Sequence, residues 1–314
     1  MIANWARTLR DYLLKGDDLI LDRPGDRSEY AIISGSRWSL TLNEARSCVR
    51  SMIWMTYRSG FPPISSFHSD SGWGCMIRTG QMMMANTIRR IDPMVSDRSV
   101  IDLFLDSPSR PLSIHNLVGA SDRGGQADGH WYAPIEICRM IETCINNTSA
   151  ISITALLCDQ GVFYDEIVSH CTEKPDSWDP CLILIPVRLG LDQINLIYSS
   201  SILEALSIPE SAGIIGGRPR SSLFIVGCFR RKLIYLDPHY VQESVHDKPL
   251  SDHVTTYHCD QFRSIFPSEL DPCLAFGFYI SNRASLDDFW SKALAISHPM
   301  WDMQIARPNY TSID

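Results

Sequence analysis

One cysteine occupies a position where the sequence predicts a reactive thiol. Cys75 follows a Gly-Trp-Gly turn at residues 72–74 in the segment DSGWGCMIR, and a run with helical spacing begins directly after it. The apolar residues of that run are Ile77, Met84, Ile88 and Ile91. Unpaired amides and the positive end of the dipole at a helix start favour a thiolate over a thiol. Cys75 is therefore a candidate nucleophile.

A cysteine nucleophile needs a base, and the base needs an orienting group. Asp237 and His239 stand two residues apart in the segment IYLDPH, so on an extended chain they point to the same side. The proline between them cannot donate to a sheet, which favours a strand end open to substrate. A carboxylate beside an imidazole favours its charged form, and that form stabilises a thiolate. A Cys75–His239–Asp237 triad is possible, but an ordinary turn with a surface histidine also explains this segment.

A metal site is the alternative use of the remaining histidines and cysteines. The adjacent pairs His170-Cys171 and His258-Cys259 are its best candidates. Structural zinc sites normally pair ligands that are two to four residues apart, which these are not. The sequence therefore predicts neither a metal nor another cofactor.

The elements that must position these residues differ between the two halves of the chain. Helices are predicted over residues 42–55, from Cys75 to about Asp92, and over 134–144. Continuous apolar runs predict strands at residues 181–187, 223–229, 233–236 and 274–280, with a hairpin turn at 230–232. Helices in the first half and strands in the second predict an α+β fold, with helices packed on a largely antiparallel sheet.

Composition narrows the class of protein. The chain has 314 residues, 45% of them hydrophobic and 20% charged, which is ordinary for a globular protein. A formal charge of −8 gives no general attraction to nucleic acid or to anionic membranes. The N-terminus lacks the pattern of a secretory signal, and the ten cysteines are irregularly spaced without a CxxC. We therefore expect a cytoplasmic protein that acts on a protein partner or a small substrate.

Several motifs, taken together and in order, resemble one enzyme family. They are TYRSGFPPI before Cys75, SDSGWGCMIRTGQ around it, GHWYAP at 129–134, LILIPVRLGLDQIN at 182–195, GIIGGRP at 213–219, IYLDPH at 234–239 and LAFGFYI near the end. From about Arg46 to about Phe289, the chain is similar to the autophagins, the cysteine peptidases of autophagy. Each motif alone would be weak, but the ordered set is highly specific.

This resemblance implies a fold and a set of catalytic residues. It implies a papain-like cysteine peptidase domain with a small additional lobe at residues 31–295, between an N-terminal arm at 1–30 and a C-terminal tail at 296–314. It assigns the catalytic roles to Cys75, His239 and Asp237. It also implies that Tyr57 stabilises the oxyanion together with the backbone N–H of the nucleophile, as a phenol and an amide can. No cofactor is implied.

The resemblance also implies a substrate. Autophagins cleave after the C-terminal glycine of a ubiquitin-like modifier, both to mature its precursor and to release it from phosphatidylethanolamine, so membrane proximity would be transient and only through lipidated substrate. Trp131 and Pro219 resemble the pair that closes over the active-site entrance, where a narrow slot selects a residue without a Cβ. Gly216 and Gly217 would let the 213–219 loop move. No nucleic-acid partner is expected.

Two other functions and a second contact are also compatible with the sequence. A thiol acyltransferase could use the same triad, and a non-catalytic scaffold could bind the modifier on the same fold. In the tail, Tyr310 and Ile313 match the aromatic-x-x-aliphatic spacing that autophagy modifiers recognise. Such a segment could add a strand to the edge of the modifier's sheet.

Overall fold

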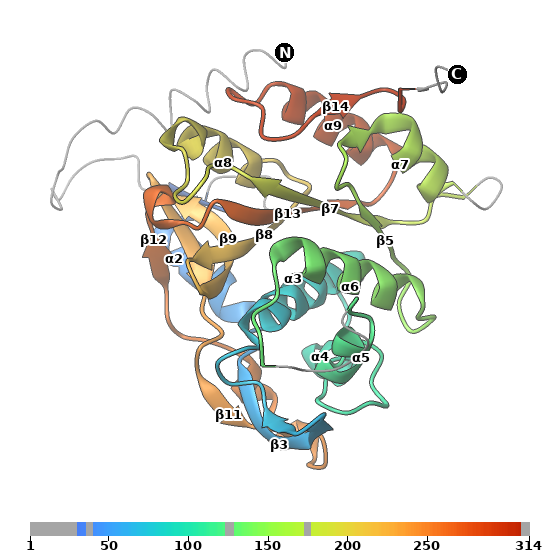
Figure 1. The fold of residues 1–314 in the computed structure, drawn as a ribbon, viewed down its shortest axis with the longest axis vertical. Coiled ribbons are helices and arrows are strands. Elements are labelled where there is room, and N and C mark those ends of the chain that lie inside the picture. The colour runs from blue at the N-terminus through green and yellow to red at the C-terminus, as the bar shows by residue number, and fades with distance from the viewer. Residues whose placement is uncertain (1–29, 36–39, 123–128, 173–176, 309–314) are drawn as a thin grey trace, which may run out of the picture.

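A nine-stranded sheet crosses the molecule (Figure 1). The computed structural model describes residues 30–35, 40–122, 129–172 and 177–308. The strand order is β12-β10-β9-β8-β13-β7-β5, with β1 added beside β9 and β2 beside β1. Neighbours are antiparallel except β5 and β7, which are parallel. The strands are β1 (Tyr30–Ile33), β2 (Leu40–Thr41), β5 (Thr154–Leu157), β7 (Cys181–Arg188), β8 (Ser211–Arg218), β9 (Ser221–Phe229), β10 (Lys232–Leu236), β12 (Arg263–Ile265) and β13 (Cys273–Ile280).

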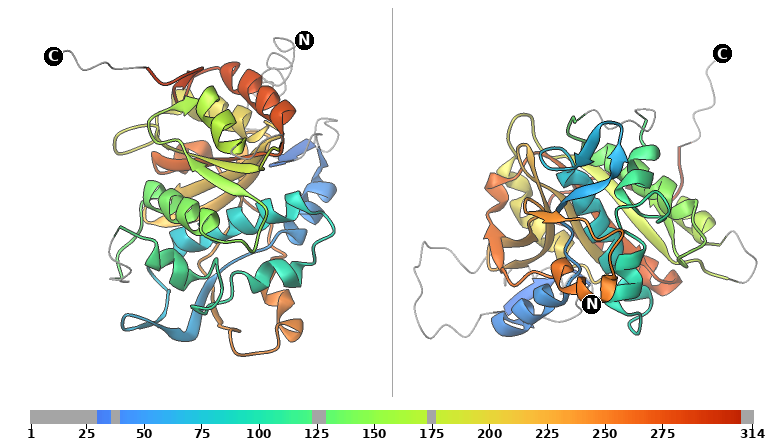
Figure 2. Two further views of the ribbon diagram at one scale, coloured as in Figure 1. Left: turned by 90° about the vertical axis from the view of Figure 1, so that its right-hand side faces the viewer. Right: turned by 90° about the horizontal axis from the view of Figure 1, so that it is seen from below.

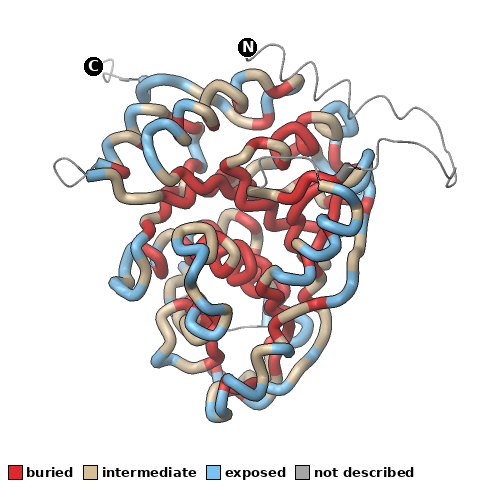
Figure 3. Tube along the Cα trace, turned by 180° about the vertical axis from the view of Figure 1, so that it is seen from behind, coloured by how far each residue is buried: buried red, intermediate tan, exposed pale blue. Residues whose placement is uncertain are grey.

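Helices cover both faces of this sheet, and each face has its own hydrophobic core (Figures 2 and 3). Side chains alternate between the faces, so Phe276 and Phe278 of β13 lie in one core while Ala275 and Tyr279 lie in the other. One face is covered by α3 (Cys75–Ile91) and α6 (Pro134–Asn146). The other is covered by α7 (Tyr164–Cys171), α8 (Ser199–Leu206) and α9 (Arg283–Leu294).

A smaller three-stranded sheet lies at the lower end of Figure 1. Its order is β11 (Val241–Glu243), β3 (Tyr57–Ile64) and β4 (Phe67–Ser69). β11 runs parallel to β3, and in this register Val241 pairs with Tyr57. This pairing brings the residues after His239 beside the start of β3.

The remaining elements are short. They are α2 (Leu42–Ser51), α4 (Asp97–Asp102), α5 (Ile114–Gly119), η1 (Leu196–Tyr198), η2 (Leu250–Asp252), η3 (Val254–Tyr257), η4 (Pro267–Glu269), and the pair β6 (Val162–Phe163) and β14 (Met303–Gln304). β14 pairs parallel with β6. Arg307 forms an ion pair with Glu166 at 2.9 Å, so the tail up to residue 308 is attached to the body. Among the described residues, no helix is both long and apolar enough to cross a membrane.

The α+β class is confirmed, together with the helix from Cys75, the helix from Pro134, the four predicted strands and the hairpin between β9 and β10. The predicted separation of helices from strands is wrong, because β1 to β4 precede α3 and α7 to α9 lie in the second half. The helix predicted over 42–55 ends at Ser51. There Asn86 of α3 hydrogen-bonds both the N–H and the carbonyl of Ile53, each at 3.0 Å, which holds the next residues extended. The predicted arm at 1–30, apart from Tyr30, and the motif of Tyr310 and Ile313 lie outside the described residues.

Candidate active site

Cys75 is the first residue of α3, and its side chain is only 1% exposed. The N–H of Gly74 donates to the carbonyl of Asp70 at 2.8 Å, which closes the turn before the helix. A Cβ on Gly74 would lie 2.4 Å from Asp70 Oδ2, so only glycine fits this close approach. The turn thus delivers the cysteine to a helix start, as the sequence predicts.

His239 and Asp237 follow the end of β10. Asp237 Oδ1 lies 2.7 Å from His239 Nδ1 and also accepts the backbone N–H of His239 at 3.1 Å. Arg263 of β12 donates to the other carboxylate oxygen at 3.2 Å. The Trp54 indole donates to the Asp237 carbonyl at 2.7 Å. Asp237 is therefore fixed from three directions, with its carboxylate aimed at the imidazole.

Tyr57 completes the group from the smaller sheet. Its ring packs edge-on against the imidazole of His239, with 5.5 Å between ring centroids. Its backbone N–H donates to the carbonyl of Pro238 at 3.0 Å. The structure therefore brings together all four residues predicted to carry the chemistry, because Tyr57 also hydrogen-bonds to Cys75.

The electrostatics favour a charged Cys75–His239 pair. Burial opposes ionisation of Cys75, but hydrogen bonds from His239 and from the backbone of Ser222, with the charge of His239, lower the pKa of the thiol. Burial also opposes a charged imidazole, yet hydrogen bonds to Asp237 and Cys75 raise the pKa of His239 to about 9. Burial raises the pKa of Tyr57, as does the nearby Cys75 thiolate, so the phenol stays protonated and can donate.

Comparison with known proteins agrees with this geometry. Residues 42–292 match the family model of the peptidase C54 catalytic domain. The chain belongs to the peptidase C54 family. Its mixed helix and sheet architecture is the papain-like fold expected for such a domain, and the catalytic domain is of the cysteine peptidase type.

Curated relatives carry matching names. The chain is 34% identical over 286 residues to "Cysteine protease ATG4b" of Arabidopsis thaliana, an alignment that covers 79% of this chain and 60% of that protein. It is 32% identical over 290 residues to "Probable cysteine protease atg4" of Aspergillus niger, covering 78% and 71%. A third relative, "Probable cysteine protease ATG4" of Meyerozyma guilliermondii, is 33% identical over 287 residues, covering 78% and 67%. The chain thus spans only part of these C54 proteins.

A buried ion network that sequence reasoning missed lies beside the candidate site. Arg78 of α3 contacts Asp70 and Asp106, each at 2.8 Å, and the three side chains are at most 2% exposed. Asp70 Oδ1 also accepts the backbone N–H of Arg58 at 2.7 Å. The network therefore joins the first turns of α3 to the residue after Tyr57. An arginine on the inner side of a helix, three residues after Cys75, was the signal available in the sequence.

Three further contacts also escaped prediction. Arg263 lies 26 residues from Asp237 in sequence, and no local pattern announces their contact. The Ser222 backbone hydrogen-bonds to Cys75, and Ser221 Oγ lies 3.5 Å from His239 Nε2. Both serines belong to β9, but they precede the strand that the sequence predicts at residues 223–229.

The predicted gating residues have different surroundings. Pro219 is exposed in the turn between β8 and β9, two residues before Ser221, whose Oγ lies near His239 Nε2. Gly216 and Gly217 are buried in β8, paired with Leu223 and Ser222, so the prediction of a loop over 213–219 is wrong for residues 213–218, which form a strand. Glycine fits in this strand because the neighbouring strand is too close for a side chain. A Cβ on Gly217 would lie 2.4 Å from the Ser221 carbonyl oxygen. Trp131 lies before α6, half-buried against the core that contains α3.

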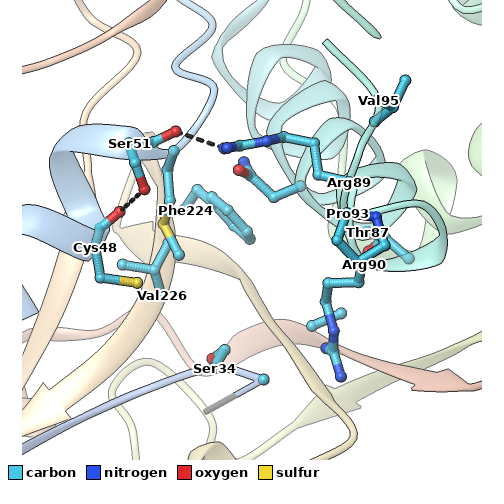
Figure 4. Close-up of a pocket in the computed structure, with 14 residues that line it drawn as sticks. Ser34, Cys48, Ser51, Thr87, Arg89, Arg90, Pro93, Val95, Phe224 and Val226 are labelled. Atoms are coloured by element: carbon cyan, nitrogen blue, oxygen red, sulfur yellow. Dashed lines mark hydrogen bonds between the residues drawn. The ribbon is translucent and has the colours of Figure 1, made fainter. Parts of the chain in front are cut away.

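A cleft lies at the other end of α3 and does not include the predicted C54 triad (Figure 4). In Figure 4, Arg89 reaches toward Ser51 and donates to its carbonyl, while Arg90 points to the opposite wall.

His258, a candidate for the alternative metal site, contacts the Met52 carbonyl at 3.1 Å and Asp97 at 3.3 Å. Within the described ranges, no three histidine, cysteine or acidic side chains gather closely enough to hold a metal ion.

Proposed function

We propose that this chain is a cysteine endopeptidase that cleaves after the C-terminal glycine of a ubiquitin-like autophagy modifier. The observation that carries the proposal is the 2.7 Å contact between His239 and Asp237, with the imidazole hydrogen-bonded to a buried Cys75 whose pKa is lowered. This arrangement belongs to a chain of the C54 family. The modifier as substrate follows from the motifs shared with the autophagins.

The reaction follows from the positions of these groups. The Cys75 thiolate attacks the glycine carbonyl, and the developing oxyanion accepts hydrogen bonds from the Tyr57 phenol and the Cys75 N–H. The C–N bond breaks as His239 donates its proton to the leaving nitrogen, which gives an acyl-enzyme. Water, deprotonated by His239, then attacks the thioester, and the C–S bond breaks. The modifier leaves with a carboxyl group on its glycine, and the Cys75 thiolate and the charged His239 are restored. Asp237 holds the imidazole and its charge throughout.

The same site serves both maturation and release from lipid in this proposal. In each substrate, the bond that breaks joins the glycine carbonyl to an amine nitrogen. The leaving amine belongs to a peptide in the precursor and to ethanolamine in the lipid conjugate. Because the triad acts only on the shared amide, one arrangement of Cys75 and His239 is enough for both reactions.

Selection of glycine is the second part of the proposal. Trp131 and Pro219 would close over the entrance and leave a slot too narrow for a side chain. This proposal is supported by the position of Pro219. It begins the turn before Ser221, and the Oγ of Ser221 lies near His239. Gly216 and Gly217, being paired in β8, would let the strand approach β9 rather than move as a loop. Tyr310 and Ile313 are proposed as a second contact with the modifier. Deletion of residues 308–314 in the Cys75→Ala protein, followed by titration with the modifier in a calorimeter, would test this contact.

One assay tests the main proposal against its alternatives. The chain is incubated with modifier extended beyond its glycine, and the products are weighed by intact mass spectrometry. We expect a modifier that ends in glycine, and no product with Cys75→Ala, which should still bind the modifier because only the sulfur is removed. Binding without cleavage by the wild-type chain would indicate a scaffold. Transfer to an added amine in place of water would indicate an acyltransferase.

A further inference from the structure

The turn between β8 and β9 carries an exposed cation, Arg220. Arg220 is exposed, and among the described residues it has no ion pair, whereas Arg218 contacts Glu269 at 3.3 Å. Arg220 adopts φ 62°, a left-handed conformation that is strained for an L residue with a side chain. Glycine or asparagine would fit this turn with less strain. An arginine at a strained position is a reason to examine what its charge could contact.

The residues that follow Arg220 place it near the nitrogen of His239 that donates to the leaving group. Nδ1 of His239 contacts Asp237, so Nε2 must give the proton to the leaving nitrogen. Ser221, the residue after Arg220, has its Oγ 3.5 Å from that Nε2. The backbone of Ser222 hydrogen-bonds to Cys75. Arg220 therefore directly precedes Ser221 and Ser222, the segment that lies on the leaving-group side of His239.

We propose that Arg220 binds the phosphodiester of phosphatidylethanolamine when the lipid-conjugated modifier is the substrate. The inference rests on the proposed release reaction. In that conjugate, the phosphate stands only two carbons and one oxygen beyond the nitrogen that His239 must protonate. A guanidinium donates to phosphate oxygens in a fork, and its long side chain spans such a distance from the neighbouring residue. The chain carries a charge of −8, so a local cation is needed to favour this anionic leaving group.

Two soluble substrates isolate the phosphate from any membrane. Modifier is conjugated through its glycine either to glycerophosphoethanolamine or to ethanolamine, which lacks the phosphate, and kcat/KM is measured for each. We expect the wild-type chain to prefer the phosphate conjugate. Arg220→Asn should lower that preference by about fivefold, the size of a solvent-accessible ion pair, and Arg220→Lys should retain part of it.

Arg230 provides a matched control. It is also exposed and left-handed, with φ 54°, and it lies in the turn at the opposite end of the nine-residue β9. Arg230→Asn makes the same change in net charge and in turn strain, but far from His239. The ratio of the two kcat/KM values should be unchanged in this variant.

Each other outcome contradicts a different statement. Equal cleavage of both conjugates by the wild-type chain, or an equal loss on both in Arg220→Asn, would show that Arg220 does not bind the phosphate. A changed ratio in Arg230→Asn would attribute the effect to net charge. If the wild-type chain cleaves extended precursor but neither conjugate, this inference fails while maturation stands. If it cleaves no glycine-ended substrate, the proposed function itself fails.

Discussion

The ionisation of Cys75 depends on a balance between burial and hydrogen bonding. Without the donors, burial alone would raise the pKa of the thiol, as it does for Cys48. We expect iodoacetamide to alkylate wild-type Cys75 rapidly at pH 7, and His239→Asn to slow that reaction strongly. The difference should shrink at alkaline pH, where an unassisted thiol also ionises. Peptide mass spectrometry separates Cys75 from Cys48, whose slow alkylation should be the same in both proteins.

The fall in cleavage rate at alkaline pH should be set by His239. Its raised pKa means that the imidazole is charged below about 9 and neutral above. Cleavage should therefore fall as pH rises through about 9, because the leaving amine then finds no proton. A rate that continues to rise above that pH would show that His239 is not the acid.

Orientation of the base is a separate contribution. Asp237→Asn keeps the shape of the side chain but removes the charge that holds the imidazolium, so kcat should fall by about 100-fold or more. Circular dichroism should remain that of the wild-type chain. Unchanged turnover would mean that a group other than Asp237 orients His239.

At this scale the sequence predicted the residues whose neighbours are close in sequence. Asp237 and His239 are two apart, and Cys75 is marked by its turn and helix. Tyr57 came only from the resemblance. Arg263 could not be found, because its contact with Asp237 exists only after β12 pairs with β10.

The start of α3 depends on a glycine that has no unusual backbone conformation. At Gly74, φ is −84°, but a Cβ would collide with Asp70. Gly74→Ala should therefore displace the first turn, lower the melting temperature and remove most activity. Gly119→Ala is the control, because Gly119 ends α5 and has nothing within 4 Å of its Cβ position. A Gly74→Ala protein as stable and active as Gly119→Ala would contradict the close approach.

The ion network beside α3 should dominate the electrostatic part of stability. Asp70→Asn leaves buried Arg78 with only Asp106, and we expect the free energy of unfolding to fall by about 3–5 kcal/mol. Asp260→Asn is the matched change at the surface, where Asp260 is 86% exposed and pairs with Arg50. It should cost less than about 1 kcal/mol. Urea denaturation of both variants measures the difference, and equal losses would mean that Asp70 is not charged in the folded protein.

Among the elements, β8 is a strand where the sequence predicts a mobile loop. A run with three glycines reads as a mobile loop, and strands usually exclude glycine. Here the glycines serve close packing, since a Cβ on Gly213 would lie 2.7 Å from the Ile225 carbonyl oxygen of β9. This reason is a contact with a partner strand, so it becomes visible only in the folded sheet.

In the whole molecule, β13 connects the two hydrophobic cores. On one face, Phe278 packs against Phe289 of α9, with 4.6 Å between ring centroids. On the other face, the absence of a side chain at Gly277 lets Met83 of α3 approach, since a Cβ there would lie 2.6 Å from its sulfur. The core beneath α9 and the helix that carries Cys75 thus share one strand. We expect them to unfold together.

Phe278→Ala tests this coupling from the face that does not touch α3. The cavity left by the ring should lower the free energy of unfolding by about 3–5 kcal/mol. If the cores are coupled, Cys138 of α6, which is buried in the core that contains α3, should become open to alkylation at the same urea concentration at which the far-ultraviolet circular dichroism is lost, in the variant as in the wild-type chain. Phe266→Ala is the control, because Phe266 is 46% exposed and its loss should shift neither midpoint appreciably. A loss of circular dichroism at a lower urea concentration than the opening of Cys138 would show that the two faces of the sheet unfold separately.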